Sequence, residues 1–269
     1  MTLPISSTAD YQVYSSEDPD APQAPDYKSI FKACLITGYG QGADEKAPAG
    51  WELVFDEADK LVIRPNDPRG DNDLLRIEHD GIYRKISSFE SMTDVDNGVA
   101  ASNNHYIVGG NGSWFIVATL AWCLLIINVN NTDGVANVVF FGNLPSGLPE
   151  ELNKTILLNT SYSHNSAAFP QPLYSHGAQN YHRNQKIRPY PPYRVANGYY
   201  NIATTGNLKW CDLIVSSATE LIGVLPILKC TPVNAGFETW HEIAPNAYAL
   251  KVSSHNTRGQ LVMDFNDVN

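Results

Sequence analysis

The sequence is poor in basic residues. It has 18 lysines and arginines against 28 aspartates and glutamates, which gives a formal net charge of -10. A protein whose main task is to grip nucleic acid normally presents a basic face, so this balance argues against nucleic acid as a partner. The first ten residues also lack the basic start and apolar core of a secretory signal, so we expect synthesis in the cytoplasm.

Close cysteine pairs and known catalytic signatures are missing as well. The sequence contains no CxxC pair, Walker loop, dinucleotide fingerprint, HExxH motif or paired-carboxylate motif. The acidic stretch from Ser91 to Gly98 lacks the glutamate that closes a calcium-binding loop, so it predicts a turn. We therefore expect a protein that is not an enzyme, with no cofactor and no metal. Buried free thiols are predicted for the four separated cysteines, Cys34, Cys123, Cys211 and Cys230.

The longest apolar run, from Trp114 to Val129, is too short for a membrane-spanning helix. It has sixteen residues, whereas about twenty are needed to cross the hydrocarbon, and no basic residue flanks it. We therefore expect no membrane contact. The β-branched and aromatic residues in the run predict two buried strands instead, at 114–117 and 122–129, with a turn at 118–121. A third strand predicted at 135–141 completes a meander in the centre of a sheet.

Prolines, glycines and tyrosines are frequent, with 17, 19 and 14 of each. Because Pro and Gly end regular elements and Tyr favours pleated surfaces, this composition predicts many strands and few helices. One short helix is predicted from Tyr27, since Ile30, Phe31 and Cys34 would share its face.

Alternating apolar residues predict strands along the rest of the chain. Hairpins are predicted at 51–64 and, around Asp80-Gly81, at 75–86. Pro226 lies in a predicted strand and indicates an edge or a bulge, because proline cannot donate to the ladder. The expected fold is mainly β, an antiparallel sandwich or barrel-like domain with one short helix near the N-terminus and long loops. Strands near the C-terminus are predicted at 208–216, 221–230, 247–252 and 260–265.

Two boundaries are expected along the chain. Residues 1–26 contain four prolines, several acids and no apolar period. They predict an extended N-terminal arm that is disordered when free, and two interpretations stay open: a solvated tail, or an arm whose Tyr11, Val13 and Tyr14 become ordered against a neighbouring subunit. Residues 27–269 form the β-rich domain. The composition shifts to Asn, Ser, His, Tyr and Pro after Leu144, which leaves open a subdivision there.

The segment 160–200 is rich in tyrosine and histidine and shows little periodicity. Its adjacent Ser and His residues carry no nucleophile motif, so a catalytic pair is not favoured. Two interpretations stay open, because aromatic and basic side chains suit either glycan or base stacking or a protein contact. We favour a protein contact that includes the tyrosines of the arm. The predicted interface residues are Tyr11, Tyr14, Tyr181, Arg183, Tyr190 and Tyr193.

Six segments of the chain occur in a characteristic order: FKACLITGYG (31–40), AGW (49–51), FESMTDVDNG (89–98), WFIVA (114–118), VVFFGN (138–143) and QLVMDFND (260–267). In these segments the chain resembles a group of structural proteins of tailed-bacteriophage virions. That group has a KACLVTGYG-like opening, then AAGW, an MTD-x-D-x-G block and an FFGD-like strand. This chain departs from the pattern at Asn143, where the group has an aspartate.

The resemblance implies a building block of a virion, made in the host cytoplasm and located in the particle. It implies a role in the tail, baseplate or neck in preference to capsid decoration. The expected partners are other virion proteins and further copies of the chain in a symmetric assembly, with no nucleic acid and no membrane. The alternative is a lectin-like or receptor-binding module that holds a glycan through the tyrosines of 160–200.

Overall fold

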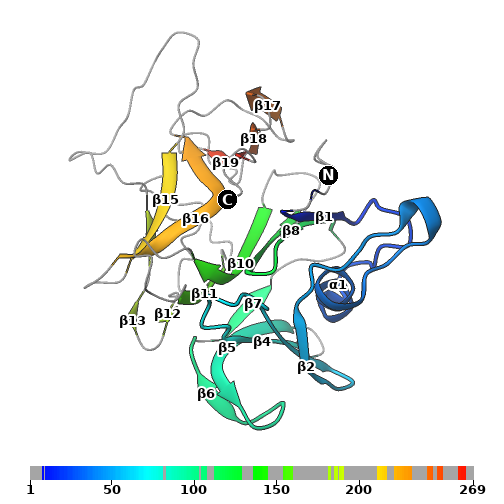
Figure 1. Ribbon diagram of the computed structural model, residues 1–269, viewed down its shortest axis with the longest axis vertical. Helices are drawn as coiled ribbons and strands as arrows, with labels where there is room; N and C mark the ends of the chain where they lie inside the picture. Colours follow the sequence, from blue (N-terminus) through cyan, green and yellow to red (C-terminus); the bar gives the residue numbers. More distant parts are fainter. Residues whose placement is uncertain are drawn as a thin grey trace.

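The protein is built from stacked antiparallel β-sheets with a short helix at one side (Figure 1). Strands dominate, and a six-residue α-helix lies near the N-terminus, which confirms the predicted fold class. A computed structural model describes the chain at residues 8, 10–80, 83–102, 104–107, 112–128, 136–144, 154–159, 181–182, 185–186, 188–190, 211–216, 221–231, 241–244, 247–250 and 260–264.

The central sheet has five strands in the order β1-β8-β9-β10-β11. β8 and β9 divide the long apolar run as predicted, and β10 follows to complete the meander. Side chains on both faces of these strands are buried, which explains why the run is apolar without interruption. The strands are β1 (Gln12–Ser15), β8 (Trp114–Ala118), β9 (Trp122–Asn128), β10 (Ala136–Leu144) and β11 (Lys154–Asn159).

The outer sheet has the strand order β2-β3-β4-β5-β6, and a further strand, β7, also pairs with β5. Both predicted hairpins are confirmed, as β2–β3 and β4–β5. The second is paired as far as Asp80 and Tyr83, and residues 81–82 lie outside the described part. The strands are β2 (Glu52–Asp56), β3 (Lys60–Arg64), β4 (Leu74–Asp80), β5 (Tyr83–Met92), β6 (Gly98–Ala100) and β7 (His105–Ile107).

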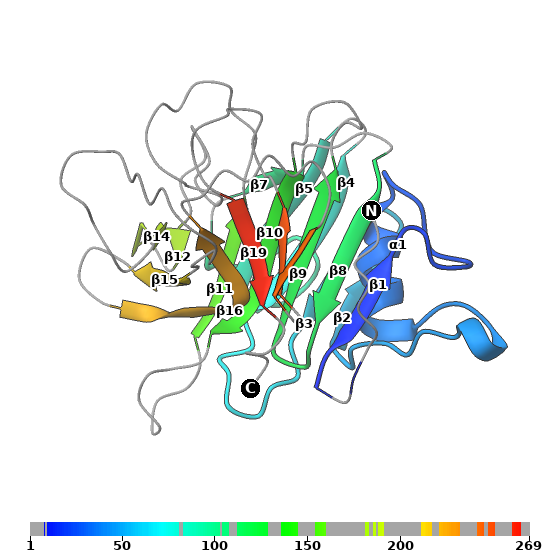
Figure 2. The same cartoon turned by 90° about the horizontal axis from the view of Figure 1, so that it is seen from above.

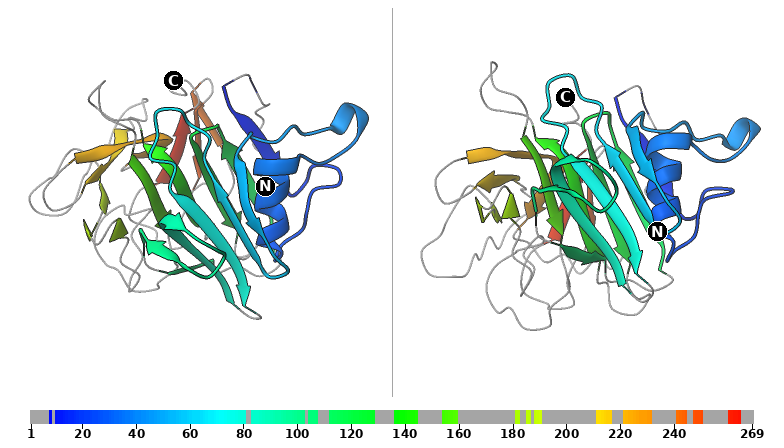
Figure 3. Two further views of the ribbon diagram at one scale, coloured as in Figure 1. Left: turned by 60° about the horizontal axis from the view of Figure 1, so that its bottom comes forward. Right: turned by 90° about the horizontal axis from the view of Figure 1, so that it is seen from below.

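The central and outer sheets face each other, and helix α1 (Tyr27–Lys32) closes one side of the sandwich (Figure 3). Asp26 caps the helix by accepting a hydrogen bond from the N–H of Ser29 at 3.0 Å. The helix continues into a π-helical turn, η1 (Ala33–Thr37), and a 3-10 turn follows, η2 (Gly42–Asp44). The predicted apolar face of the helix is buried in the sandwich core, which includes Tyr27, Ile30, Phe31, Cys34, Trp51, Trp114, Leu125 and Phe141.

A third sheet lies over the other face of the central sheet, where β16 contacts β10 (Figure 2). Its order is β14-β15-β16-β19-β18-β17. Pro226 lies in β16, which is an interior strand, so the predicted edge position is wrong. The pairing with β15 shifts from Asp212–Lys229 to Ile214–Val224 around Pro226, which confirms the predicted bulge. The strands are β14 (Arg188–Tyr190), β15 (Cys211–Ser216), β16 (Leu221–Thr231), β17 (His241–Ala244), β18 (Ala247–Leu250) and β19 (Gln260–Asp264), and β12 (Tyr181–His182) pairs separately with β13 (Gln185–Lys186).

The N-terminal arm is the first prediction that needs correction. Residues 12–15 form β1, which pairs with β8 of the same chain. Tyr14 is completely buried, and its hydroxyl donates to the carbonyl oxygen of Ala47 at 2.8 Å. The short Gln-Val-Tyr-Ser stretch is ordered because β8 offers it an open edge and the core accepts its tyrosine. This part of the predicted arm therefore belongs to the fold.

The boundary left open near Leu144 also needs correction. β10 ends at Leu144 and pairs with β11, which places Leu144 opposite Lys154. The prediction missed β11 because its short apolar stretch stands alone among polar residues. The central sheet therefore contains strands from both sides of the proposed boundary.

Polar side chains at both ends of β11 fasten the central sheet to the outer sheet. At one end, the Asn143 amide on β10 donates to Asp67 Oδ2 at 3.1 Å and to Asn72 Oδ1 at 2.9 Å, both in the loop between β3 and β4. The Thr155 hydroxyl donates to Asn143 Oδ1. At the other end, Asn159 donates to the carbonyl oxygen of Tyr106 on β7 at 2.8 Å. The register of the two layers is therefore held by directional bonds as well as by apolar packing.

We predict that Asn143→Asp lowers the free energy of unfolding by about 2 to 3 kcal/mol, measured by urea denaturation at neutral pH. Aspartate removes the donor to Asp67 and places a second carboxylate beside it without changing the size of the side chain. Asn104→Asp is the matched control, because Asn104 is exposed. Equal stability of the two variants would show that the Asn143 bonds contribute nothing.

His105 lies in the sandwich with 1% of its surface exposed, and among the described residues neither imidazole nitrogen has a hydrogen-bond partner. Burial lowers the pKa of His105 from 6.5 to about 4. In the unfolded chain His105 binds a proton near pH 6.5, whereas in the folded protein it does not. Protonation of His105 therefore leaves the free energy of unfolding at its full value above pH 6.5. Stability is lost progressively as the pH falls towards 4.

We predict that His105 costs the protein about 2 kcal/mol of unfolding free energy between pH 7 and pH 5. In urea denaturation, the wild type should therefore lose about 2 kcal/mol more than His105→Leu across this interval, because leucine does not titrate. Parallel pH profiles for the wild type and His105→Leu would contradict the prediction.

Candidate contact surface

The structure does not bring the predicted interface residues together within its described part. Tyr11 and Tyr14 are buried in their own chain, which corrects their assignment to a contact with a neighbour. Tyr181 is in β12 and Tyr190 in β14. Arg183 and Tyr193, like most of the 160–200 segment, lie outside the described residues. A protein or glycan contact through that segment stays a prediction.

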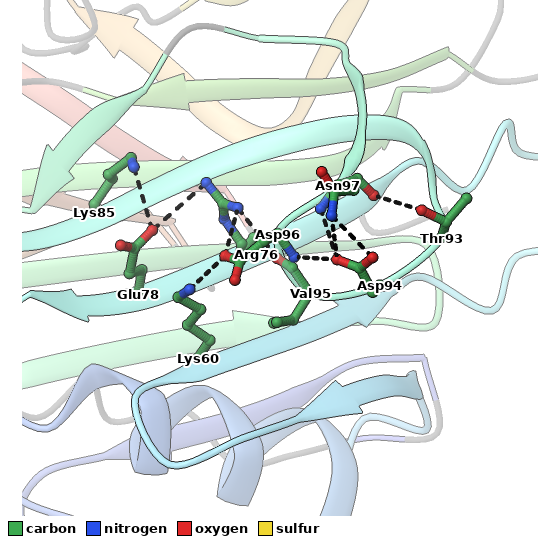
Figure 4. Close-up of polar contacts among 9 residues, drawn as sticks. All are labelled: Lys60, Arg76, Glu78, Lys85, Thr93, Asp94, Val95, Asp96 and Asn97. Carbon is green, nitrogen blue, oxygen red and sulfur yellow. Dashed lines mark hydrogen bonds and ion pairs between the residues drawn. The ribbon is translucent and has the colours of Figure 1, made fainter.

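The outer face of the outer sheet carries a row of charges that crosses three strands (Figure 4). Glu78 on β4 stands opposite Lys60 on β3 and opposite Lys85 on β5. Lys85 Nζ lies 3.2 Å from Glu78 Oε2. The alternation along β4 places this row outside while Leu75 and Ile77 enter the core. Opposite charges therefore face each other across the ladder, which stabilises the strand pairing.

Arg76 is the buried member of this face, with 8% of its surface exposed. Its guanidinium lies 3.5 Å from Glu78 Oε2, donates to the carbonyl oxygen of Val95 at 3.2 Å, and stands 4.9 Å from the centre of the Phe89 ring. Asp96 Oδ1 is 3.9 Å away and also binds Lys60. These contacts hold the turn at 93–97 down on the sheet.

The turn at 93–97 is the one predicted from its acidic sequence, and Asp94 organises it. Asp94 Oδ1 accepts the backbone N–H groups of Asp96 and Asn97, each at 2.9 Å. The Asn97 side-chain amide also donates to it, and this bond is the main cause of the lowered pKa of Asp94. Val95 is thereby pressed onto Val62, Leu74 and Phe89 in a small second apolar cluster. The turn is rigid because both its backbone and its apolar residue have partners.

Three strands at sheet edges are protected by side chains. Lys46 Nζ donates to the carbonyl oxygen of Val13 on β1 at 3.4 Å. Asn159 similarly covers the Tyr106 carbonyl of β7. β2 has a register shift in mid-strand and ends at Asp56, whose pKa is lowered by hydrogen bonds from two lysines of α1. Charges, bulges and side-chain caps are the usual means of preventing an edge from pairing with another chain.

β6 is the exception among these edges. All three of its residues are exposed, none is charged, and Val99 has 56% of its surface in solvent. Its inner side is held close to β5, since a Cβ added at Gly98 would lie 2.4 Å from the carbonyl oxygen of Ser91. Within the described residues, no side chain bonds to its outward edge. β6 lies beside β5 at the end of the sheet, on the side away from α1 (Figure 1).

Chemically, this surface offers backbone donors and acceptors, one apolar side chain and a rigid charged turn. Such a surface can accept an extended strand from another chain. The described residues contain no cluster of three or more His, Cys, Asp or Glu side chains that could hold a metal ion. The same residues include no helix long and apolar enough to cross a membrane.

Sequence reasoning did not identify this surface, although two signals for it were present. Gly98-Val99-Ala100 is an uncharged stretch directly after an acidic turn, and this pattern indicates an edge strand without protecting charges. Arg76 and Glu78 interrupt an apolar strand at alternate positions, which marks a charged outer face.

No protein-family model matches this chain, and the comparison with curated proteins found no match.

We predict that Arg76→Met lowers the free energy of unfolding by about 2 kcal/mol and loosens the 93–97 turn. The substitution keeps most of the apolar contact with Phe89 but removes the bonds to Val95 and Asp96. Amide hydrogen exchange at residues 95–97 should accelerate together with the loss of stability. Lys85→Met is the control, and as an outlying ion pair it should change stability by less than about 1 kcal/mol. Unchanged exchange at 95–97 in Arg76→Met would refute this role.

Proposed function

We propose that the protein is a structural component of a tailed-phage virion that acts through repeated contacts with neighbouring proteins. One structural observation supports a contact role, namely the exposed, uncharged β6 edge with Val99 beside a rigid turn. The virion assignment rests on the ordered sequence segments described above. The tail, baseplate or neck is preferred to the capsid surface on the same basis.

In the proposed contact, an extended segment of a neighbouring protein pairs with β6. The backbone of β6 supplies hydrogen bonds, which give affinity without demanding a particular partner sequence. Val99 supplies apolar contact on one side of the strand. The turn at 93–97 limits how the segment approaches, because its own hydrogen bonds keep it in place. Further copies of the chain and other virion proteins are the proposed partners.

The virion assignment is tested by quantitative mass spectrometry of purified particles from cells that produce them. We expect peptides of this chain in the particles, in a constant ratio to the other structural proteins, because a symmetric assembly uses a set number of copies. Immunogold labelling with an antibody to this chain would then locate it in the particle. A chain that is abundant in the cells but absent from the particles would overturn the proposal.

The β6 contact is tested separately by complementation with Val99→Lys. A lysine on an edge strand opposes pairing, so we expect the amount of the chain in particles to fall at least about tenfold, equivalent to ~1.4 kcal/mol of binding free energy. Leu53→Lys is the matched control, because Leu53 is 40% exposed on β2, at the opposite end of the same sheet. Equal incorporation of both variants would leave the virion role standing and would reject β6 as the contact.

A further inference from the structure

Two of the four cysteines are paired in the strand ladder of the third sheet, although they are not neighbours in the sequence. β15 and β16 are antiparallel neighbours, and their register places Cys211 directly opposite Cys230. Asp212 and Lys229 form the adjacent pair, and the register shift of this ladder begins after Asp212. The other two cysteines, Cys34 and Cys123, are free thiols buried in the sandwich core.

The backbone positions suit a covalent link between the two strands. Residues directly opposite each other in an antiparallel ladder have Cα atoms roughly 4.5 to 5.5 Å apart. A disulfide bond joins residues whose Cα atoms are about 4.4 to 6.8 Å apart. The two strands therefore need no large rearrangement to bring a disulfide between them within range.

We propose that Cys211 and Cys230 are a redox pair that closes to a disulfide when the protein meets a disulfide oxidant. With glutathione disulfide, one cysteine thiolate displaces a glutathione thiolate and forms a mixed disulfide. The second cysteine thiolate then attacks the protein sulfur and displaces the second glutathione. One S–S bond is exchanged for another, two electrons pass to glutathione, and the two cysteine protons end on the two glutathione thiols.

The same reaction is disfavoured at the other two cysteines. The side chains of Cys34 and Cys123 are completely buried. Burial raises the pKa of both thiols, which keeps them in the unreactive protonated form. Oxidation of the folded protein should therefore be selective for one pair among the four cysteines.

This inference does not depend on the proposed function, although the two are compatible. A chain made in the cytoplasm keeps its thiols reduced, whereas a released particle enters an oxidising solution. A disulfide across β15 and β16 would then close after release and strengthen the sheet, since it restricts the unfolded chain. The experiment below uses the purified protein alone, so its failure would leave the virion proposal untouched.

The folded protein is incubated with glutathione disulfide, quenched with acid, unfolded and alkylated. We expect the count of free thiols to fall from four to two, and peptide mapping to find Cys211 linked to Cys230. Cys211→Ser and Cys230→Ser each lack the second thiol that resolves the mixed disulfide, so neither should form a bond between two protein cysteines, and peptide mapping should find glutathione held on the one cysteine that remains of the pair. Cys123→Ala is the matched control, and it should still lose two of its three thiols.

Three outcomes would overturn the proposal. In the oxidised wild type, they are four surviving thiols, a link between any other pair, and glutathione retained on Cys211 or Cys230 without a link. The peptide map of the wild type decides the question even if a serine variant fails to fold.

Discussion

The structure depends on one constraint, which is that the central sheet is apolar on both faces and must be covered on both. Along β9, Leu124 and Ile126 face one side while Cys123, Leu125 and Ile127 face the other, and all are buried. The outer sheet and α1 cover the second side, and the third sheet lies over the first. Burial of this kind contributes on the order of 2 kcal/mol for each large apolar side chain, and the central sheet buries many of them. The layered order of the chain follows from it, because the most apolar segment lies in the middle of the sequence and needs partners from both ends.

Packing the sheets face to face does not cover the hydrogen-bonding groups at their edges. Individual polar side chains cover several of these groups. Lys46 and Asn159 each donate to one outward carbonyl, and the lysines of α1 bind the end of β2. In β11, three alternate residues serve both purposes. Leu157 packs in the core, and Thr155 and Asn159 form hydrogen bonds at the two ends of the strand. The described residues place no such side chain on β6, which is informative because the same sheet protects its opposite edge at β2.

Much of the fold could be predicted from the sequence, and the exceptions have a common physical cause. The helix at Tyr27 and the β8–β9–β10 meander have strong local patterns, so they were predicted correctly. β1 and β11 were missed because their order comes from a neighbouring strand and not from their own composition. Tyr14 could not be recognised as a core residue for the same reason, and the exposed Val99 carries no side-chain chemistry that a motif could reveal. The choice of asparagine at position 143 is explained only by the structure. The Asn143 amide donates to the Asp67 carboxylate, which would repel an aspartate at the same position.

The size of the β6 edge also bears on the kind of assembly it fits. A strand of three residues offers few hydrogen bonds, and association must first overcome the loss of rotational and translational freedom. One such contact is too weak to hold two proteins together, and an isolated receptor-binding module that relied on it would dissociate readily. In a ring or lattice, each subunit makes several contacts at once, and the later ones form at a high effective concentration. A short, uncharged edge is therefore better suited to a subunit that is repeated many times than to a protein that binds one partner alone.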